Sequence, residues 1–403
     1  MIILVLNCGS SSLKYQVLDM KSNDDYTLMA KGLVERIGEK VGSIAHSVPG
    51  NDKFIVEKYI PDHSAGIKEV LDMLVSKDHG VLESLSQIDA VGHRVAHGGE
   101  FFKGSALVTP EAESFIEKCC ELAPLHNPAN LLGIRAVKEL MPSIPQVAVF
   151  DTSFHQTMPD YAFTYSIPYK FYEKYGVRRY GFHGTSHKFV AAKAAKFVGI
   201  DLENSKIITC HLGNGSSITA VRNGKSVDTS MGFTPIEGVT MGTRCGSLDA
   251  GAISFLQEKE GLDSAGISKV LNKQSGLLGI SGVSSDFRDI QAAALEGNPR
   301  ALLARRTLTY GIKKTIGAYA AVLNGADMIV FTGGIGENAS AVRSEVCNGM
   351  EYLGVEFDDQ INDQVHGKDA VISKPSSRVK VVVVTTDEEL VIAQDTMAIV
   401  KNK

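Results

Sequence analysis

Residues 4–19 read LVLNCGSSSLKYQVLD, and residues 208–223 read ITCHLGNGSSITAVRN. Each segment consists of a β-rich run, a turn of glycine and serine, and a second β-rich run that follows at once. Glycine lets a ligand approach the backbone closely, and consecutive N–H groups in such a turn form a concavity that binds anions. Serine hydroxyls, such as those of Ser10 and Ser12, can add hydrogen bonds to phosphate oxygens. A phosphate-binding hairpin that occurs twice, about half a chain apart, predicts two related domains that bind one nucleotide between them.

The composition is that of an ordinary globular protein. The chain has 403 residues, of which 44% are hydrophobic and 22% charged, and this length allows two domains with their own cores. A net charge of −5 argues against nucleic acid or an anionic membrane as the main partner. The N-terminal run MIILVL is expected to be a strand and not a signal peptide, and no apolar run approaches the ~20 residues of a membrane helix. The six cysteines lack metal-ligand spacing and are expected to be reduced thiols of a cytoplasmic protein.

The hydrophobic pattern predicts an α/β architecture with central sheets. Strands are expected over residues 2–6, 13–18, 28–34, 43–48, 54–59, 88–91, 146–150, 207–210, 328–331 and 379–384. Helices are expected over 64–75 with Ser64 as the N-cap, near 110–122 and 128–140, from GFHGTSH to about 198, over 299–323 and 338–349, and from Thr386 onward. The aromatic 160s and 170s and residues 229–247 are expected to form loops.

Other nucleotide signatures are absent or incomplete. The sequence contains no G-x-x-x-x-G-K-[ST] motif of P-loop enzymes. Residues 213–218, GNGSSI, lack the third glycine of a dinucleotide fingerprint and lead into a strand where that fingerprint requires a helix. Residues 333–338, GGIGEN, read as a glycine turn between a strand and a helix, whose N-terminal N–H groups could face an anion or a nucleoside.

Three charged residues are candidates for the chemistry. Asp151 follows an apolar strand in QVAVFDTSFH, where α/β proteins place functional groups, although it could simply cap the next segment. Arg94, in GHRVAHGG, could bind a carboxylate or phosphate with two parallel hydrogen bonds, or form a structural salt bridge. Arg244, in TMGTRCGSLD, suits a loop that wraps an anion, or a solvated loop arginine.

Two further motifs have a structural and a functional interpretation. His183 and His187 have the i, i+4 spacing of a zinc pair, but no third ligand is nearby in the sequence. We therefore expect a histidine there to donate hydrogen bonds to developing charge. TTDEEL reads as a capping box from Thr386 to Glu389, and Glu388 in the same motif could hold Mg²⁺ directly or through water.

Taken together, these motifs resemble the acetate kinase family. NCGSSSLKY, GHRVAHGG, FDTSFH, GFHGTSH, HLGNGSS, MGTRCGSLD, GGIGEN and TTDEEL occur in the family's order over residues 1–400. The resemblance implies two related α/β domains of the actin-like ATPase (ribonuclease H-like) type, with the nucleotide in the interdomain cleft. The N-terminal domain would comprise 1–150 plus 386–403, and the C-terminal domain 151–385 with most of the nucleotide site. A homodimer is a further family expectation.

The resemblance also implies reversible transfer of the γ-phosphoryl group of ATP to acetate, which gives acetyl phosphate and ADP. Arg94 would bind the substrate carboxylate, Asp151 would be the catalytic carboxylate, and His183 and Arg244 would stabilise the transition state. Because a carboxylate is already ionised at neutral pH, no base is needed to activate it. Asp151 is therefore expected to position a cation or an arginine.

Metal, nucleotide and acyl sites follow from the same resemblance. Asn7 and Glu388 would hold Mg²⁺ or Mn²⁺, and Lys14 would contact nucleotide phosphate. The residues expected to line the nucleotide are His211, Leu212, Gly213, Asn214, Gly215, Asp286, Phe287, Arg288, Gly334, Ile335, Gly336, Glu337 and Asn338. Those expected around the acetate methyl group are Ala96, Leu125, Phe182 and Pro235.

Two departures from the family pattern leave alternatives open. Ala96 and Cys8 stand where other members often carry a larger aliphatic residue and a serine, respectively. One methyl group tunes selectivity only modestly, so propionate or butyrate kinase is one alternative. Independently of these departures, an ATP-driven conformational module without kinase activity, like actin or the heat-shock ATPases, is a second alternative.

Overall fold

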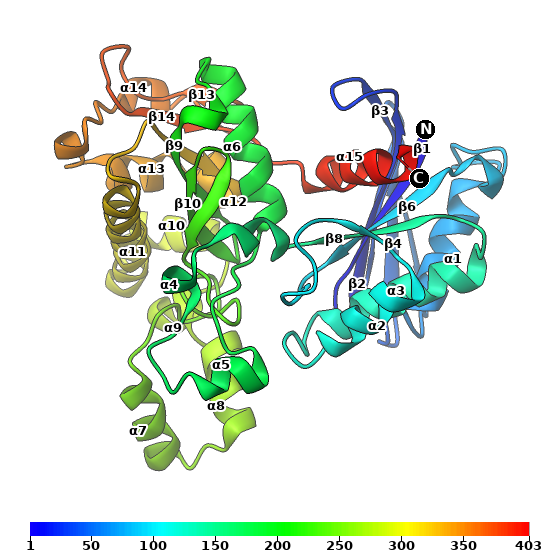
Figure 1. The fold of residues 1–403 in the computed structure, drawn as a ribbon, viewed down its shortest axis with the longest axis horizontal. Helices are drawn as coiled ribbons and strands as arrows, with labels where there is room; N and C mark the ends of the chain where they lie inside the picture. Colours follow the sequence, from blue (N-terminus) through cyan, green and yellow to red (C-terminus); the bar gives the residue numbers. More distant parts are fainter. Residues whose placement is uncertain (403) are drawn as a thin grey trace. The chain divides into compact units, whose positions relative to one another are not determined.

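The computed structural model describes residues 1–402 and separates into two compact units. The first comprises Met1–Phe154 and the C-terminal segment from Asp387, and the second comprises His155–Thr386 (Figure 1). The 3-10 helix η2 (Ser153–Thr157) spans the division. The domain boundaries expected from the sequence, after residues 150 and 385, stay predictions about the folding domains.

An eight-stranded sheet forms the first unit, in the order β5-β4-β3-β2-β1-β6-β8-β7. Its strands are β1 (Ile2–Cys8), β2 (Ser12–Met20), β3 (Tyr26–Glu35), β4 (Gly42–Ser47), β5 (Phe54–Lys58), β6 (Ala90–Val95), β7 (Ala106–Leu107) and β8 (Gln146–Phe150). Strands β1 to β5 pair antiparallel, whereas β1, β6 and β8 are parallel neighbours. The carboxyl ends of β1, β6 and β8 therefore lie at one edge of the sheet.

Helices cover both faces of this sheet (Figure 1). They are α1 (His63–Leu74), α2 (Pro110–Lys118), α3 (Asn127–Leu140), α15 (Glu388–Lys401) and the 3-10 helix η1 (Leu85–Gln87). Leu4 and Leu6 of β1 share a hydrophobic core with Ile67 of α1 and Val137 of α3. On the other face Gly92 is closely covered by α15, because a Cβ there would lie 2.6 Å from a methyl carbon of Ile392.

Two helix caps differ from the sequence prediction. Helix α1 begins at His63, and its N-cap is Asp62, whose side chain accepts a hydrogen bond of 2.8 Å from the N–H of Ala65; Ser64 lies inside the helix. Helix α15 is capped by Asp387, which accepts from the N–H of Leu390 at 3.0 Å, so the predicted box headed by Thr386 does not form. In both cases an aspartate takes the cap that was predicted for a nearby hydroxyl residue, since both side chains can accept from the backbone.

The second unit repeats the strand order of the first. Its sheet runs β11-β10-β9-β12-β14-β13, with β9 (Lys206–Leu212), β10 (Ser216–Arg222), β11 (Lys225–Thr229), β12 (Met328–Thr332), β13 (Ala370–Val371) and β14 (Lys380–Val383). Strands β9, β10 and β11 pair antiparallel, and β9, β12 and β14 pair parallel, as β1, β2, β3, β6 and β8 do in the first unit. This shared order confirms the prediction of two related α/β units from the repeated hairpin.

Helices α6 and α11 lie on opposite faces of the second sheet (Figure 1). The helices of this unit are α4 (Asp160–Phe163), α5 (Lys170–Tyr175), α6 (Gly184–Val198), α7 (Ala250–Glu260), α8 (Ser264–Lys273), α9 (Gly276–Ser281), α10 (Phe287–Leu295), α11 (Pro299–Leu323), α12 (Gly333–Asn338), α13 (Ser340–Cys347), α14 (Asp359–Asn362), η3 (Leu202–Asn204) and η4 (Glu351–Leu353). Ile208 and Cys210 of β9 pack against α11, while the intervening Thr209 faces α6. This alternation follows from the two-residue period of a strand.

Some segments differ from their predicted conformation. GGIGEN is the short helix α12 and not a turn, and the predicted helix 338–349 is α13, which begins at Ser340. The 160s and 170s contain helices α4 and α5 in place of a continuous loop. The strand expected over residues 88–91 is β6, which continues to Val95 and so includes Arg94.

Candidate active site

Three polar side chains meet at the carboxyl ends of β1, β6 and β8 in the first unit. Arg94, near the end of β6, donates from Nε to Oδ1 of Asp151 at 3.0 Å and from Nη2 to Oδ2 at 2.6 Å. Its Nη1 donates to Oδ1 of Asn7, on β1, at 3.3 Å. Asp151, which follows β8, is 2% exposed, whereas 29% of the Arg94 side chain is accessible. Because the three strands are parallel neighbours, Asp151 and Asn7 hold the Arg94 guanidinium from the protein side. Part of the arginine side chain remains accessible to a ligand.

Glu388 extends this cluster from the first turn of α15. Its Oε2 lies 4.0 Å from Nε of Arg94. Burial raises the pKa of Glu388 to about 7, Arg94 opposes the increase, and the carboxylates of Asp151 and Glu389 add to it. Asp151 in turn raises the pKa of Arg94, which remains a fixed cation. Arg94 therefore supplies one permanent positive charge to this cluster, and Asp151, Asn7 and Glu388 supply side-chain oxygens.

Lys14 lies beside the same cluster but has a partner of its own. Its Nζ is 2.5 Å from Oε1 of Glu389, and about half of its side chain is exposed. The turn before it is closed by a hydrogen bond of 2.8 Å from the N–H of Gly9 to the carbonyl oxygen of Ser12. Ser10 is exposed in this turn, and Ser12 begins β2. The first hairpin thus has accessible hydroxyl and ammonium groups, as a phosphate contact requires.

The residues expected around the acyl group are divided between the units. Ala96 and Leu125 belong to the first, in which Ala96 is 7% exposed and Leu125 is 57% exposed. Phe182 and Pro235 belong to the second: Phe182 packs against two buried methionines, and the Pro235 carbonyl oxygen accepts from Nη1 of Arg244 at 3.3 Å. Cys8 is buried, which raises its thiol pKa to about 12 and makes it a packing residue.

In the second unit, His183 and Arg244 converge on the glycine turn of the second hairpin. A Cβ placed on Gly215 would lie 3.4 Å from both Nη1 of Arg244 and Cε1 of His183. His183 immediately precedes α6 with φ 57° and ψ 23°, a left-handed conformation that is uncommon for residues with a Cβ and is often found at functional sites. Its Nδ1 lies 2.9 Å from Oγ of Ser217, and its ring stacks on that of His211 with centroids 4.3 Å apart. The hairpin therefore carries an imidazole and a guanidinium close to one stretch of backbone.

The zinc interpretation of His183 and His187 is not supported by their surroundings. Both nitrogens of His187 have hydroxyl partners, Thr209 on one side and Ser217 on the other, each at 2.7 Å. Within residues 1–402, no group of three or more histidine, cysteine or acidic side chains is arranged to hold a metal ion.

None of the described helices combines the length and the apolar composition of a membrane span.

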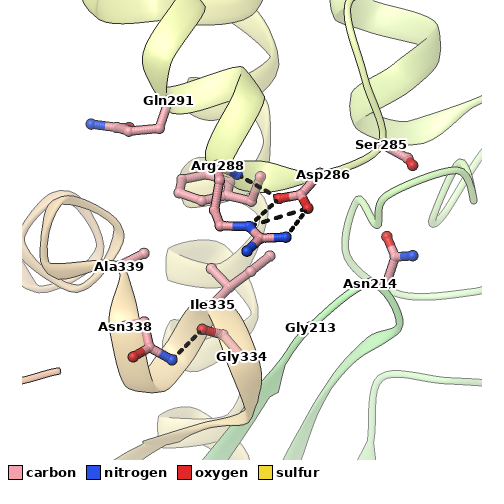
Figure 2. Close-up of a pocket in the computed structure, with 11 residues that line it drawn as sticks. Gly213, Asn214, Ser285, Asp286, Arg288, Gln291, Gly334, Ile335, Asn338 and Ala339 are labelled. Carbon is pink, nitrogen blue, oxygen red and sulfur yellow. Dashed lines mark hydrogen bonds and ion pairs between the residues drawn. The ribbon is translucent and has the colours of Figure 1, made fainter. Parts of the chain in front are cut away.

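A cavity of about 860 Å³ lies beside the second hairpin. Figure 2 shows Asp286 and Arg288 on one side, Gly334 and Ile335 opposite them, and Asn214 at a third side. The lining residues are Gly213, Asn214, Ser285, Asp286, Phe287, Arg288, Gln291, Gly334, Ile335, Asn338 and Ala339. Its volume is within the range of small-ligand pockets, and its walls combine apolar surface with a few polar groups.

One charged pair stands in the wall of this cavity. Arg288 donates from Nη2 to Oδ2 of Asp286 at 2.6 Å, and its backbone N–H donates to Oδ1 at 2.8 Å (Figure 2). These contacts lower the pKa of Asp286 to about 2. The Arg288 side chain is 89% exposed, so its guanidinium remains accessible to a ligand.

Not every residue expected at the nucleotide lines the cavity. His211, Leu212, Gly215, Gly336 and Glu337 lie outside its lining, as do Lys14, Ser10 and Ser12 of the other unit. Oε1 of Glu337 instead accepts from the N–H groups of Gly333 and Thr386, at 2.9 and 3.1 Å. Ser285, Gln291 and Ala339 also line the cavity and were not predicted, because they lie near the predicted motifs but carry no signature of their own.

The fold and the two sites define a class of protein: two related α/β units, one with a fixed arginine–carboxylate cluster and one with a nucleotide-sized cavity. The model of the acetokinase family matches residues 2–394. The sequence is 55% identical to an acetate kinase from Phocaeicola vulgatus, over 98% of this chain and 99% of that one, and 56% identical to one from Caldanaerobacter subterraneus, over 99% of both. The chain therefore belongs to the acetokinase family, and it is an enzyme, a phosphotransferase with a carboxyl group as acceptor.

Solved structures give the same relationship. The crystal structure of Porphyromonas gingivalis acetate kinase is 50% identical in sequence and superposes with a TM-score of 0.95, covering 99% of both chains. That of a propionate kinase from Francisella tularensis is 40% identical, with a TM-score of 0.91 over 98% of this chain and 99% of that one. The fold is thus common to relatives named for two different acids.

Proposed function

We propose that this enzyme catalyses the reversible transfer of the γ-phosphoryl group of ATP to acetate, giving acetyl phosphate and ADP. Full-length relatives named acetate kinase, at 53–56% identity, support this assignment. The observation that carries it is the double hydrogen bond between Arg94 and Asp151. A guanidinium that is held by a buried carboxylate and remains partly accessible suits the binding of a small anion.

The chemical problem is the approach of two anions, because a carboxylate and a triphosphate repel each other. Acetate is ionised at neutral pH, so the reaction needs alignment and positive charge more than a general base. Arg94 binds the carboxylate of acetate, and Asp151 orients Arg94. His183 and Arg244 stabilise the charge that develops on the oxygens of the transferring phosphoryl group.

The nucleotide occupies the cavity beside the second hairpin. Ile335 and Phe287 supply apolar surface to the base, while Gly213 and Asn214 line the side of the cavity at which the phosphates are proposed to lie. Lys14, Ser10 and Ser12 contact phosphate from the first hairpin. The other residues of the motifs at 211–215, 286–288 and 334–338 support this wall, including Glu337 through its hydrogen bonds to the backbone.

The donor groups near Arg94 fit a divalent metal. Asn7 and Glu388 supply an amide and a carboxylate oxygen, the hard ligands that Mg²⁺ prefers, and Mg²⁺ commonly takes its remaining ligands from water and substrate phosphate. We propose that Asn7 and Glu388 hold Mg²⁺, with Mn²⁺ as a substitute. When bound, the ion would neutralise charge on the nucleotide phosphates and help to align them.

The acyl range is the main alternative within this reaction. A related fold is that of a propionate kinase, and Ala96 leaves more space than a larger aliphatic side chain would. Ala96, Leu125, Phe182 and Pro235 are the proposed acyl contacts. Incubating the enzyme with ATP, Mg²⁺ and acetate, propionate or butyrate, and trapping the acyl phosphate as a hydroxamate, measures kcat/KM for each acid. The assignment predicts the highest value for acetate; a higher value for propionate or butyrate would contradict it.

Two properties of the assembled enzyme are also proposed, the dimer from the resemblance and the location and partners from the composition of the sequence. We propose a cytoplasmic homodimer that acts without nucleic acid or membrane partners. Light scattering during size-exclusion chromatography should give twice the mass of the 43.3 kDa chain. If acid-dependent ADP formation were absent and nucleotide still bound, the non-kinase conformational module would be the better assignment.

A further inference from the structure

A chain of hydrogen bonds in the second unit runs from the centre of the sheet to His183. Oγ1 of Thr209, on β9, lies 2.7 Å from Nδ1 of His187, on α6. Nε2 of His187 lies 2.7 Å from Oγ of Ser217, on β10, and this Oγ lies 2.9 Å from Nδ1 of His183. Thr209, His187 and Ser217 are fully buried, so water does not replace any of these contacts.

The direction of each hydrogen bond follows from the number of hydrogens available. Among residues 1–402 the Thr209 hydroxyl has one hydrogen-bond partner, Nδ1 of His187. A buried hydroxyl hydrogen without an acceptor is destabilising, so Thr209 donates to Nδ1. A neutral imidazole has a single N–H, which in His187 must then be at Nε2 and donate to Ser217. Ser217 has one hydrogen of its own, which it donates to Nδ1 of His183.

The surroundings of His187 keep that ring neutral, as this argument requires. Burial holds its pKa well below the usual range, and the neighbouring rings of His155 and His211 lower it further. The His155 and His211 rings lie with their centroids 5.8 and 6.3 Å from that of His187. A second proton on His187 would remove the acceptor that the Thr209 hydroxyl uses.

We propose that Thr209, His187 and Ser217 are positioning residues that hold His183 as the neutral tautomer with its hydrogen on Nε2. The Nε2 edge faces the turn at Gly215, where a Cβ would lie 3.5 Å from Nε2 and 3.4 Å from Nη1 of Arg244. The inference rests on the proposed role of His183 in phosphoryl transfer. It adds that His183 acts as a neutral N–H donor whose orientation is set from inside the fold, an arrangement known to polarise oxygen atoms elsewhere.

The tautomer can be observed directly, apart from any activity. In full-length protein labelled with ¹⁵N-histidine, long-range ¹H–¹⁵N NMR spectra at pH 8 distinguish protonated from unprotonated ring nitrogens. The signals of His183 are those lost in His183→Gln. The proposal predicts an unprotonated Nδ1 and a protonated Nε2. A hydrogen on Nδ1, alone or on both nitrogens, would overturn it, whereas an absence of acetate kinase activity would count only against the proposed function.

Matched variants separate the effect of the hydrogen-bond relay, formed by Thr209, His187 and Ser217, from the effect of general packing. Thr209→Val and Ser217→Ala remove hydroxyls of the relay. Thr219→Val makes the same change at a fully buried hydroxyl on β10, whose partner is Thr229 at 2.8 Å. Loss of one oriented hydrogen bond should lower kcat about tenfold with KM for ATP unchanged, and should mix the His183 tautomers. Thr219→Val should retain the wild-type spectrum and kcat.

Either relay variant suffices for the test if the other fails to fold. A folded Ser217→Ala or Thr209→Val protein with the wild-type tautomer and kcat would overturn the proposal. Equal changes of the His183 signals in Thr209→Val and Thr219→Val would also overturn it, because the effect would then arise from packing of the sheet and not from the relay.

Discussion

The guanidinium of Arg94 and the carboxylate of Asp151 form two parallel hydrogen bonds, of 3.0 and 2.6 Å, across neighbouring parallel strands. Asp151 is almost fully buried, so it holds the arginine from the protein side and leaves the outer edge of the guanidinium partly accessible. The pair therefore explains why the sequence places an aspartate at the end of β8 even though the reaction needs no base.

Asp151→Asn tests this positioning role. An amide of the same shape can accept one hydrogen bond from Arg94 but lacks the charge and the second acceptor, so Arg94 should be less well aligned. Misalignment of this kind lowers rates on the order of 10²-fold. Steady-state kinetics should show this loss in kcat/KM for acetate, while circular dichroism shows a folded protein. Wild-type kinetics in the folded variant would contradict the role.

Gly242→Ala should weaken nucleotide binding without a change at the arginine cluster. A Cβ at Gly242 would lie 1.9 Å from Oδ1 of Asn214 and 2.9 Å from the carbonyl oxygen of Ser285, and both of these residues line the cavity. Displacement of these two cavity residues should weaken ATP binding, and a loss of about 1.4 kcal/mol of binding free energy corresponds to a roughly tenfold rise in KM for ATP. Gly311→Ala, in α11, is the control, since no atom lies within 4 Å of its Cβ apart from chain neighbours and the backbone of its own helix. Equal KM values for ATP in the two variants would show that Asn214 and Ser285 do not contact the nucleotide.

Arg343→Met should destabilise the second unit strongly. The guanidinium is fully buried and donates to Oδ1 of Asn362 and to the carbonyl oxygens of Gly336, Asn362 and Val365. Removal of these donors leaves buried acceptors unpaired, which should lower the free energy of unfolding by roughly 3–5 kcal/mol. Arg288→Met, at a side chain that is 89% exposed, should leave the free energy of unfolding almost unchanged. Chemical denaturation compares the two, and a similar midpoint in both would refute the prediction.

Buried His93 should make the protein less stable in mild acid. Burial lowers its pKa to about 4, although a hydrogen bond with Gln146 opposes this. Between about pH 6.5 and 4 the unfolded chain binds a proton at this site and the folded protein does not, so the free energy of unfolding falls as the pH falls. The loss amounts to about 3 kcal/mol by pH 4.

Urea denaturation at several pH values measures this effect. His93→Gln should reduce the slope of stability against pH in this range, and the buried His46 and His187, whose pKa values are also lowered, should account for part of what remains. The exposed His366→Gln serves as the control and should keep the wild-type slope. An unchanged slope in His93→Gln would show that His93 does not contribute.

Several elements could be predicted from local patterns because one periodicity dominates each of them. Helix α11 has the predicted bounds, 299–323, since its apolar residues recur every three to four positions and Asn298 caps a helix that starts with proline. Strand β8 likewise has its predicted bounds, 146–150, because its short apolar run fits a fully buried strand. The repeated hairpin correctly predicts two related units, because both copies occupy the same place in the strand order.

Other features depend on tertiary contacts that no local pattern encodes. Helix α7 has no buried residue, so it lacks the apolar stripe that would predict a helix. The relay through Thr209 and Ser217 requires the register of β9 against β10 and the approach of α6. Burial of Arg343 could not be predicted either, since arginine in a helix is usually solvated.

The proposed role of Arg94 is that of a fixed cation that lets a carboxylate oxygen attack the terminal phosphorus of ATP. The direct measurement is the rate of acetyl phosphate formation, trapped as hydroxamate, by Arg94→Ala and by Arg135→Ala. Arg135, in α3, is a control because its ion pairs with Glu113 and Glu117 are at the surface of the same unit. This role predicts a loss of roughly 10³–10⁵ in turnover for Arg94→Ala and almost none for Arg135→Ala. A folded Arg94→Ala enzyme with a rate near that of the wild type would contradict it.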